Sequence, residues 1–166
     1  MTITPANEQQ CLQVKNWFAD HHAVYTWGGP NMTYPMSNKT FLKLLTDKHF
    51  NSFCLLNDKQ QLLAFGQYYR RLEHHHLGRL AVNPIFRGKG LAKILINALL
   101  EQAYLHDSSA KGASLFVFRD NEIAYRCYQS LGFVETDYPE PHFPGNMENC
   151  AYMRKPNTSN SQPITR

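Results

Sequence analysis

The stretch that decides the fold reads NPIFRGKGLAKIL and runs from Asn83 to Leu95. Pro84 lacks a backbone N–H donor, so it ends the strand that the residues before it predict. Gly88 and Gly90 then open a long helix whose apolar residues share one face. Glycines at a helix N-terminus let a phosphate reach unpaired amides and the positive end of the helix dipole. The stretch therefore predicts either a phosphate seat or a tight turn before an amphipathic helix.

Two common nucleotide fingerprints do not decide between these interpretations. The chain contains no GxxxxGK[ST] pattern, and Lys93 stands where the dinucleotide fingerprint needs a glycine or an alanine. A phosphate seat here would have to be of another type, and Lys93 belongs to the solvent face of the helix.

The flanking segments predict an alternation of helices and strands. Helices are predicted at 6–20, after a cap at Ser37 or Asn38, from Gly88 onward and at 121–131. The aromatic segment 25–30 is predicted to connect the first two helices as a loop. Strands are predicted at 51–56, 62–69, 75–82, 113–118, 133–138 and 150–154, the first two and the last two as antiparallel hairpins.

This order of elements predicts the fold class. A strand, a long helix and a strand in succession need a parallel pairing, whereas hairpins are antiparallel. We therefore expect an α/β protein, more closely an α+β sandwich with a mixed, mostly antiparallel sheet flanked by helices.

Length and composition bound the class of protein. With 166 residues, 43% of them hydrophobic, the chain predicts one domain over 1–155 and a polar tail over 156–166. The net charge of +4 comes from 17 scattered cations, so we expect an anionic cofactor and no nucleic-acid partner. No apolar run is long enough for a membrane span. The four cysteines form no CxxC pair and follow no secretory leader, so we expect the reducing cytoplasm.

Two motifs resemble the GCN5-related N-acetyltransferases (the GNAT family). The first, Val82-x-Pro84-x-x-Arg87-Gly88-Lys89-Gly90-Leu91-Ala92, is similar to the acetyl-CoA motif R/Q-x-x-G-x-G/A with its leading strand. The second, Asn121-x-x-Ala124-x-x-x-Tyr128-x-x-x-Gly132-Phe133, is similar to a later motif of that family. The resemblance covers about 62–154, and the first 50 residues match only in general layout.

The resemblance implies a fold, a co-substrate and an activity. The two central parallel strands would splay apart, and acetyl-CoA would be the co-substrate, with no metal. The enzyme would transfer the acetyl group directly to a primary amine of a small molecule, a polyamine or a peptide or protein. The implied cofactor-binding residues are Leu80, Ala81, Val82, Arg87, Gly88, Lys89, Gly90, Leu91, Ala92, Asn121 and Tyr128.

The same resemblance gives these residues roles. The amides of 88–92 would hold the pyrophosphate, Arg87 would add charge, and the free edge of 80–82 would meet the pantetheine amides, because buried backbone groups need partners. Asn121 would lie near that arm, although a plain helix cap is equally consistent with its position.

Tyr128 is the candidate general acid. A phenol with a reference pKa of about 10 is protonated at neutral pH and can protonate a departing thiolate. The alternative is a tyrosine packed in the core beside Phe133. Because an ammonium must lose a proton before it attacks, His76 and Glu73, on or near the strand before the first motif, are candidate bases. Strand alternation places His74 and His76 on one face and His75 on the other, which argues against a metal site.

The acceptor side is less defined. Tyr25, Trp27 and Tyr34 are candidate acceptor-binding residues, since aromatic rings can enclose an apolar or cationic amine. The alternative for Trp27 is to anchor a lid on the core. Bacterial ribosomal-protein N-terminal acetyltransferases are similar around Tyr128 and in the closing turn, but Phe116 stands where some of them use a glutamate.

A non-catalytic acyl-CoA sensor or interaction module remains the alternative function. The sequence leaves the oligomeric state open, and a homodimer is compatible with it.

Overall fold

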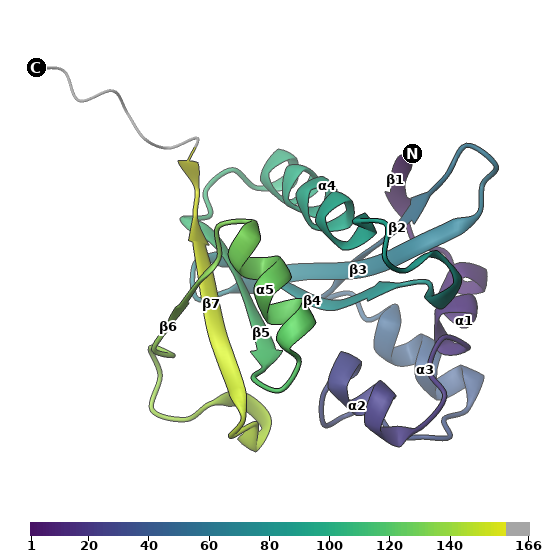
Figure 1. The fold of residues 1–166 in the computed structure, drawn as a ribbon, viewed down its shortest axis with the longest axis horizontal. Coiled ribbons are helices and arrows are strands. Elements are labelled where there is room, and N and C mark those ends of the chain that lie inside the picture. The colour runs from purple at the N-terminus through teal and green to yellow at the C-terminus, as the bar shows by residue number, and fades with distance from the viewer. Residues whose placement is uncertain (159–166) are drawn as a thin grey trace, which may run out of the picture.

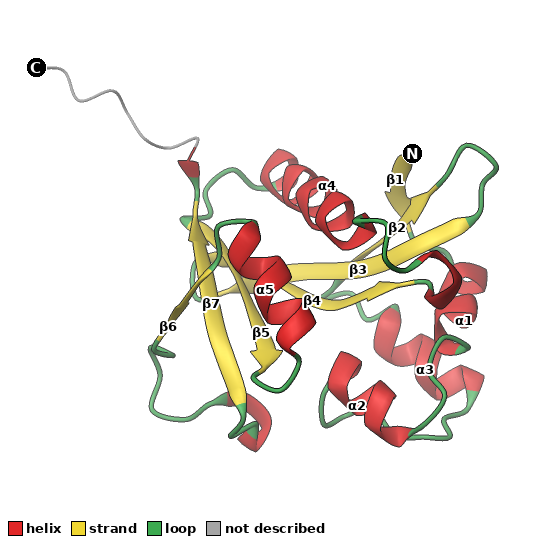
Figure 2. Ribbon diagram, viewed as in Figure 1, coloured by secondary structure: helices red, strands yellow, loops and turns green. Residues whose placement is uncertain are grey.

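A mixed sheet crosses residues 1–158, the part of the chain that this computed structural model describes (Figures 1 and 2). Within those residues the strand order is β1-β2-β3-β4-β5-β7-β6, and the β4–β5 pairing alone is parallel. The strands are β1 Thr2–Pro5, β2 Asn51–Leu56, β3 Leu62–Arg71, β4 His74–Val82, β5 Gly112–Phe118, β6 Val134–Thr136 and β7 Cys150–Pro156. The predicted fold class is confirmed.

Helices cover both faces of the sheet. They are α1 Glu8–Lys15, α2 His21–Gly28, α3 Asn38–Leu45, α4 Leu91–His106 and α5 Glu122–Ser130, with short 3-10 turns at Pro84–Phe86 and Pro144–Asn146. Figure 1 shows α4 on one face and α1–α3 on the other, which we call the α4 face and the α1–α3 face. Each face has its own core: Leu95, Leu99 and Phe133 on the α4 face, Phe41 and Phe65 on the α1–α3 face.

The two central parallel strands separate halfway along. Residues His74–Leu77 of β4 pair with Gly112–Leu115 of β5, and beyond this point β4 pairs only with β3. An extra residue on β4, where Arg79 has φ of +48°, bends the strand at the separation. We call this separation the fork; it is bounded by residues 78–82 on β4 and 116–118 on β5.

The N-terminal part of the chain differs from the prediction. The predicted helix 6–20 ends at Lys15, and β1 was not predicted. The predicted loop 25–30 is wrong, because most of it belongs to helix α2. Asp20 caps α2 by accepting a hydrogen bond from the Ala23 amide at 2.8 Å, and Gly29 ends it with φ of +81°.

The bounds of three further elements, α4, β6 and β7, also differ from the prediction. Helix α4 begins at Leu91 rather than at Gly88, since Gly88 and Gly90 have φ of +77° and +73°. Strand β6 is shorter than predicted, and β7 runs on to Pro156. Most of the predicted tail, from residue 159 on, lies outside the described residues. Among the helices of 1–158, none combines the length and apolarity needed to cross a membrane.

Candidate active site

The N-terminus of α4 carries unpaired amides. The Asn7, Asp20, Ser37 and Asn121 side chains cap the other four α-helices of residues 1–158, whereas α4 starts at Gly90 without a side-chain cap. A Cβ atom at Gly88 or Gly90 would meet nothing within 4 Å, so the backbone there is open to a ligand. The helix dipole makes these amides a seat for an anion.

The side chains around this seat take different roles. Arg87 and Lys89 are exposed, and the Lys89 ammonium lies 5.5 Å from the Phe86 ring centre. Leu91 is 5% exposed because its side chain enters the core, so only its backbone amide is available. Ala92 is small and half-buried. The seat therefore consists of backbone with two exposed cations beside it.

The fork leaves one backbone edge of β4 without a strand partner. Ala81 and Val82 pair with Phe65 and Ala64 of β3, and residues 78–82 have no ladder partner on β5. Backbone donors and acceptors at such an edge need partners, and an extended ligand with amide groups can supply them.

Asn121 caps α5. Its Oδ1 accepts a hydrogen bond from the Ala124 amide at 3.5 Å. The capping role considered for this residue is therefore present, and a contact with a cofactor arm stays a prediction.

Tyr128 lies half-buried on α5, with its ring centre 6.3 Å from that of Phe133. Its hydroxyl makes no hydrogen bond within the described part of the chain. Burial raises the pKa of Tyr128 well above its ordinary value, and neighbouring Cys127 acts in the same direction. The phenol therefore holds its proton at neutral pH and has it free to donate.

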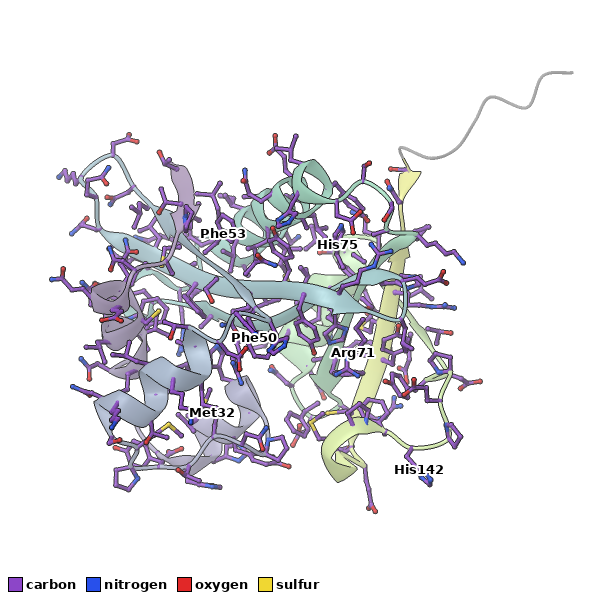
Figure 3. The ribbon with its side chains drawn as sticks, turned by 180° about the vertical axis from the view of Figure 1, so that it is seen from behind. Met32, Phe50, Phe53, Arg71, His75 and His142 are labelled. Atoms are coloured by element: carbon purple, nitrogen blue, oxygen red, sulfur yellow. The ribbon has the colours of Figure 1, made fainter. Side chains whose placement is uncertain are left out.

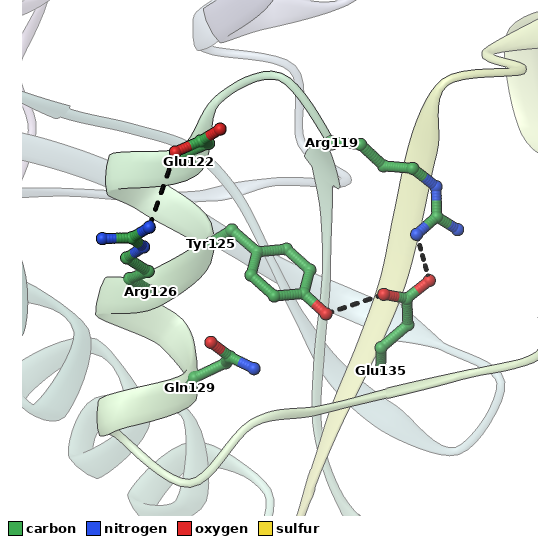
Figure 4. Close-up of a pocket in the computed structure, with 6 residues that line it drawn as sticks. All are labelled: Arg119, Glu122, Tyr125, Arg126, Gln129 and Glu135. Atoms are coloured by element: carbon green, nitrogen blue, oxygen red, sulfur yellow. Dashed lines mark hydrogen bonds and ion pairs between the residues drawn. The ribbon is translucent and has the colours of Figure 1, made fainter.

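Tyr125, three residues earlier, differs from Tyr128 in that its hydroxyl is engaged (Figure 4). Its hydroxyl donates to Glu135 at 2.7 Å, and Glu135 also pairs with Arg119. These residues line a hollow of about 350 Å³ beside α5, in which Glu122 also pairs with Arg126. Because its charges are already paired, this hollow offers little to a charged ligand.

The consecutive histidines lie on opposite faces of the sheet. His75 is buried on the α4 face, where its Nε2 lies 2.7 Å from the Asp107 carbonyl (Figure 3). His76 is 2% exposed, and its Nδ1 lies 2.8 Å from the Ser114 hydroxyl. Burial lowers the pKa of His76 to about 3, with Arg71 acting in the same direction, so this imidazole is neutral at pH 7.

Glu73 lies far from the fork. It is exposed in the turn between β3 and β4, 2.7 Å from the Lys111 ammonium. At the rise of an extended strand, Gly78 at the fork is roughly 15 Å further along β4. Within residues 1–158, no group of three or more His, Cys, Asp or Glu side chains could hold a metal ion.

The three predicted acceptor-side aromatics do not come together. The Tyr25 ring lies 5.5 Å from Phe118 at the end of β5, beside the fork. Trp27 stacks on Phe18 at 4.4 Å within the core of the α1–α3 face. Tyr34 is 46% exposed in the following loop. Tyr25 and Trp27 are two residues apart on a helix, which points them in different directions.

Sequence reasoning missed a second hollow on the α1–α3 face. It measures about 400 Å³, and Tyr138, Phe143 and Tyr152 form its aromatic wall. Tyr152 is 2% exposed, and its hydroxyl is one of two fully buried side-chain polar atoms in the described residues that lack a hydrogen-bond partner. Phe116 pairs with Tyr152 across β5 and β7, which places this wall beside the fork. No motif signals this group, because the loop before β7 brings Tyr138 and Phe143 to it.

The forked parallel strand pair and the uncapped helix end place a free backbone edge beside an anion-binding helix N-terminus. The sequence profile of the acetyltransferase (GNAT) family matches residues 13–133. L-2,4-diaminobutyric acid acetyltransferase of Vibrio cholerae is 30% identical over 131 residues, 72% of this chain and 75% of that protein. The ribosomal protein bS18-alanine N-acetyltransferase of Haemophilus ducreyi is 31% identical over 125 residues, 72% and 81% of the two chains.

A solved structure supports the fold. The spermidine N-acetyltransferase of Vibrio cholerae, solved with CoA and spermine, superposes with a TM-score of 0.69 at 18% identity, covering 92% of both chains. The chain belongs to the GNAT acetyltransferase family, as its two motifs predicted, and is an acetyl-CoA-dependent acyltransferase. Its residues fit that co-substrate, because the open backbone at Gly88 and Gly90 suits a pyrophosphate and the β4 edge suits an amide-bearing arm.

Proposed function

We propose that this protein transfers an acetyl group from acetyl-CoA directly to a primary amine, with Tyr128 as the general acid. The observation that carries the proposal is the Tyr128 hydroxyl, which makes no hydrogen bond among the described residues and belongs to the helix that follows the fork. Acetyl-CoA, when bound, supplies the acetyl group as a thioester.

The residues around the fork would bind and orient the co-substrate. The amides of 88–92 and the Arg87 guanidinium bind the pyrophosphate, and Lys89 adds a second cation. The free edge of Leu80, Ala81 and Val82 receives the pantetheine amides, and Asn121 lies near that arm.

Tyr128 protonates the departing sulfur. Burial keeps its pKa high, so the proton stays on the phenol until charge develops on the thiolate. No side-chain base is proposed on the acceptor side: His76 has too low a pKa to hold a proton taken from an ammonium, and Glu73 is too distant. The amine therefore binds as the free base, having lost its proton to bulk solvent beforehand, and neutral His76 lines the acceptor side of the fork.

The acceptor would approach from the α1–α3 face, with Tyr25 as part of its wall. The relatives named above act on a diamino acid, an alanine of a ribosomal protein and a polyamine, which together support an amine acceptor. Trp27 and Tyr34 are less well placed than Tyr25, because one is in the core and the other is at the surface.

Thiol release tests this function. The purified chain is incubated with acetyl-CoA and a panel of amino acids, diamines, polyamines and short peptides with a free N-terminus. We expect thiol to appear with at least one amine, together with its N-acetylated product by mass spectrometry. Binding of acetyl-CoA without thiol release from any amine would refute catalysis and favour a sensor.

A further inference from the structure

Two arginines differ from the other arginines of the described chain. Arg71 on β3 and Arg79 on β4 are half-buried, whereas the other five arginines within 1–158 are exposed. Three of those exposed arginines pair with carboxylates: Arg70 with Asp107, Arg119 with Glu135 and Arg126 with Glu122. Neither Arg71 nor Arg79 has a carboxylate within 4.0 Å among residues 1–158. A half-buried charge without a counterion is costly, so this exception needs a reason.

Neutral groups surround Arg71. Its Nη1 donates to the Tyr138 hydroxyl at 3.0 Å and its Nε to the Tyr69 hydroxyl at 3.4 Å. Its guanidinium carbon lies 5.3 Å from the centre of the Phe116 ring. The Glu140 carboxylate is linked to Arg71 only indirectly, because it accepts a hydrogen bond from the Tyr138 hydroxyl at 3.4 Å. The Nη2 group makes no hydrogen bond within the described residues.

The hydrogen-bond partners of Arg79 are also neutral groups. Its Nη1 donates to the Leu44 carbonyl at 3.2 Å, near the end of α3, and to the Gln67 amide oxygen at 3.1 Å. Its guanidinium carbon lies 5.0 Å from the Phe50 ring centre. The Nε and Nη2 groups make no hydrogen bond in this part of the chain. Burial lowers the pKa of Arg79, while the Tyr69 hydroxyl and the Asp47 carboxylate act in the opposite direction.

The unused donors of Arg71 and Arg79 are not sealed in the core. The fully buried, unpartnered side-chain polar atoms of residues 1–158 are Trp27 Nε1 and the Tyr152 hydroxyl, so the guanidinium nitrogens are not among them. A guanidinium has five N–H donors in one plane, and most of them stay unused at both arginines. Their geometry suits the two oxygens of a carboxylate.

Both arginines lie on the α1–α3 face: the Arg71 guanidinium lies beside the fork, and the Arg79 guanidinium lies over β3, against Gln67 and Leu44. Arg79 is the extra residue that bends β4 at the fork, and the Arg71 side chain reaches Phe116, the first β5 residue beyond the parallel pairing. Figure 3 shows Arg71 and Phe50 on that face and His75 on the opposite one. An acceptor held here by one end would place its other end at the fork.

We infer that Arg71 and Arg79 bind a carboxylate of the acceptor, so that the substrate class is amino acids that carry a free carboxylate together with the primary amine. This inference rests on the proposed function and narrows it.

Matched substrate pairs test the inference. Lysine and cadaverine, ornithine and putrescine, and 2,4-diaminobutyrate and 1,3-diaminopropane differ only in the carboxylate. In the wild-type enzyme we expect kcat/KM to be at least about tenfold higher for the amino acid in the preferred pair, because charge-assisted hydrogen bonds contribute that much. A preference for the diamines in all three pairs would overturn the inference while leaving acetyl transfer intact. Thiol release from none of the six amines, nor from the peptides, would refute the proposed function itself.

Arginine variants then test the residues. Arg71→Gln should reduce the amino-acid-to-diamine ratio of kcat/KM by about 10- to 100-fold, mainly through KM for the amino acid. Arg79→Lys keeps the charge but loses the planar donors and should reduce the ratio less. Arg70→Gln is the control: Arg70 is the sequence neighbour of Arg71 but pairs with Asp107, so this variant should keep the wild-type ratio. Because the ratio compares two substrates on one enzyme, it does not depend on the folded fraction. An unchanged ratio in Arg71→Gln would contradict the inference.

Discussion

His76 should make the stability of this protein depend on pH. The side chain is 2% exposed and contacts the Ser114 hydroxyl and the rings of Tyr69 and Phe116, at centre distances of 5.2 and 4.4 Å. Burial lowers its pKa from 6.5 to about 3. Between those two values the unfolded chain binds a proton that the folded chain excludes. Stability therefore rises with pH across this window and is lost as pH falls below about 6.5.

The size of the effect follows from the two pKa values. From pH 7 to pH 5, His76 alone should reduce the free energy of unfolding by about 2 kcal/mol. For a chain of this length, that change corresponds to roughly 6 °C in Tm.

The measurement is urea unfolding at pH 7, 6 and 5 of the wild type and of His76→Gln, which cannot titrate. We expect the variant to be less stable at pH 7 but to lose about 2 kcal/mol less than the wild type down to pH 5. Phe116→Leu is the control, because it disturbs the same packing without removing a titrating group and should keep the wild-type slope. Equal pH slopes for wild type and His76→Gln would refute a buried neutral imidazole.

Three further predictions concern the two sides of the site. Gly88→Ala should destabilise the fold by about 1–2 kcal/mol, because φ is positive there, and should weaken acetyl-CoA binding about tenfold by calorimetry, because the added Cβ enters the anion seat. Gly29→Ala is the control: its φ is similarly positive and the space around it is equally open, so this variant should affect stability alone. Arg87→Gln should weaken acetyl-CoA binding about threefold at low salt and less at high salt, while Lys93→Gln leaves the dissociation constant unchanged; a salt-independent loss would count against an electrostatic role. Tyr152→Phe should raise stability by about 1 kcal/mol, since it removes a buried hydroxyl without a partner, and a lower Tm would show that the hydroxyl is bonded in solution.

The central part of the fold could be predicted from the sequence because its signals are local. Pro84 and the glycines of Asn83–Leu95 mark where β4 ends and α4 begins, and the apolar period of α4 identifies its buried face. The fold of the N-terminal part was harder to predict from the sequence. Strand β1 is four residues long and is held by pairing with β2, which a local pattern does not show. Helix α2 had a usable signal in its Asp20 cap, but its glycines and aromatics resemble a loop.

The cofactor side of the site could also be predicted, because it consists of backbone at a motif. The acceptor side could not. Arg71, Phe116, Tyr138 and Tyr152 lie far apart in the sequence. They meet because β3, β5 and β7 present the first, second and fourth on one face of the sheet and the loop before β7 brings Tyr138 to them. Nothing in the sequence distinguishes half-buried Arg71 from exposed Arg70. Alternation along β3 points the two side chains to opposite faces of the sheet, but which face each one takes can be decided only when the register of β3 is known.

The kcat of Tyr128→Phe tests the central claim most directly. Loss of the only proton donor proposed for the thiolate should lower kcat by about a hundredfold or more, with an unchanged acetyl-CoA dissociation constant. Tyr125→Phe, on the same helix but bonded to Glu135, should keep a wild-type kcat. A Tyr128→Phe enzyme with wild-type kcat would contradict the account.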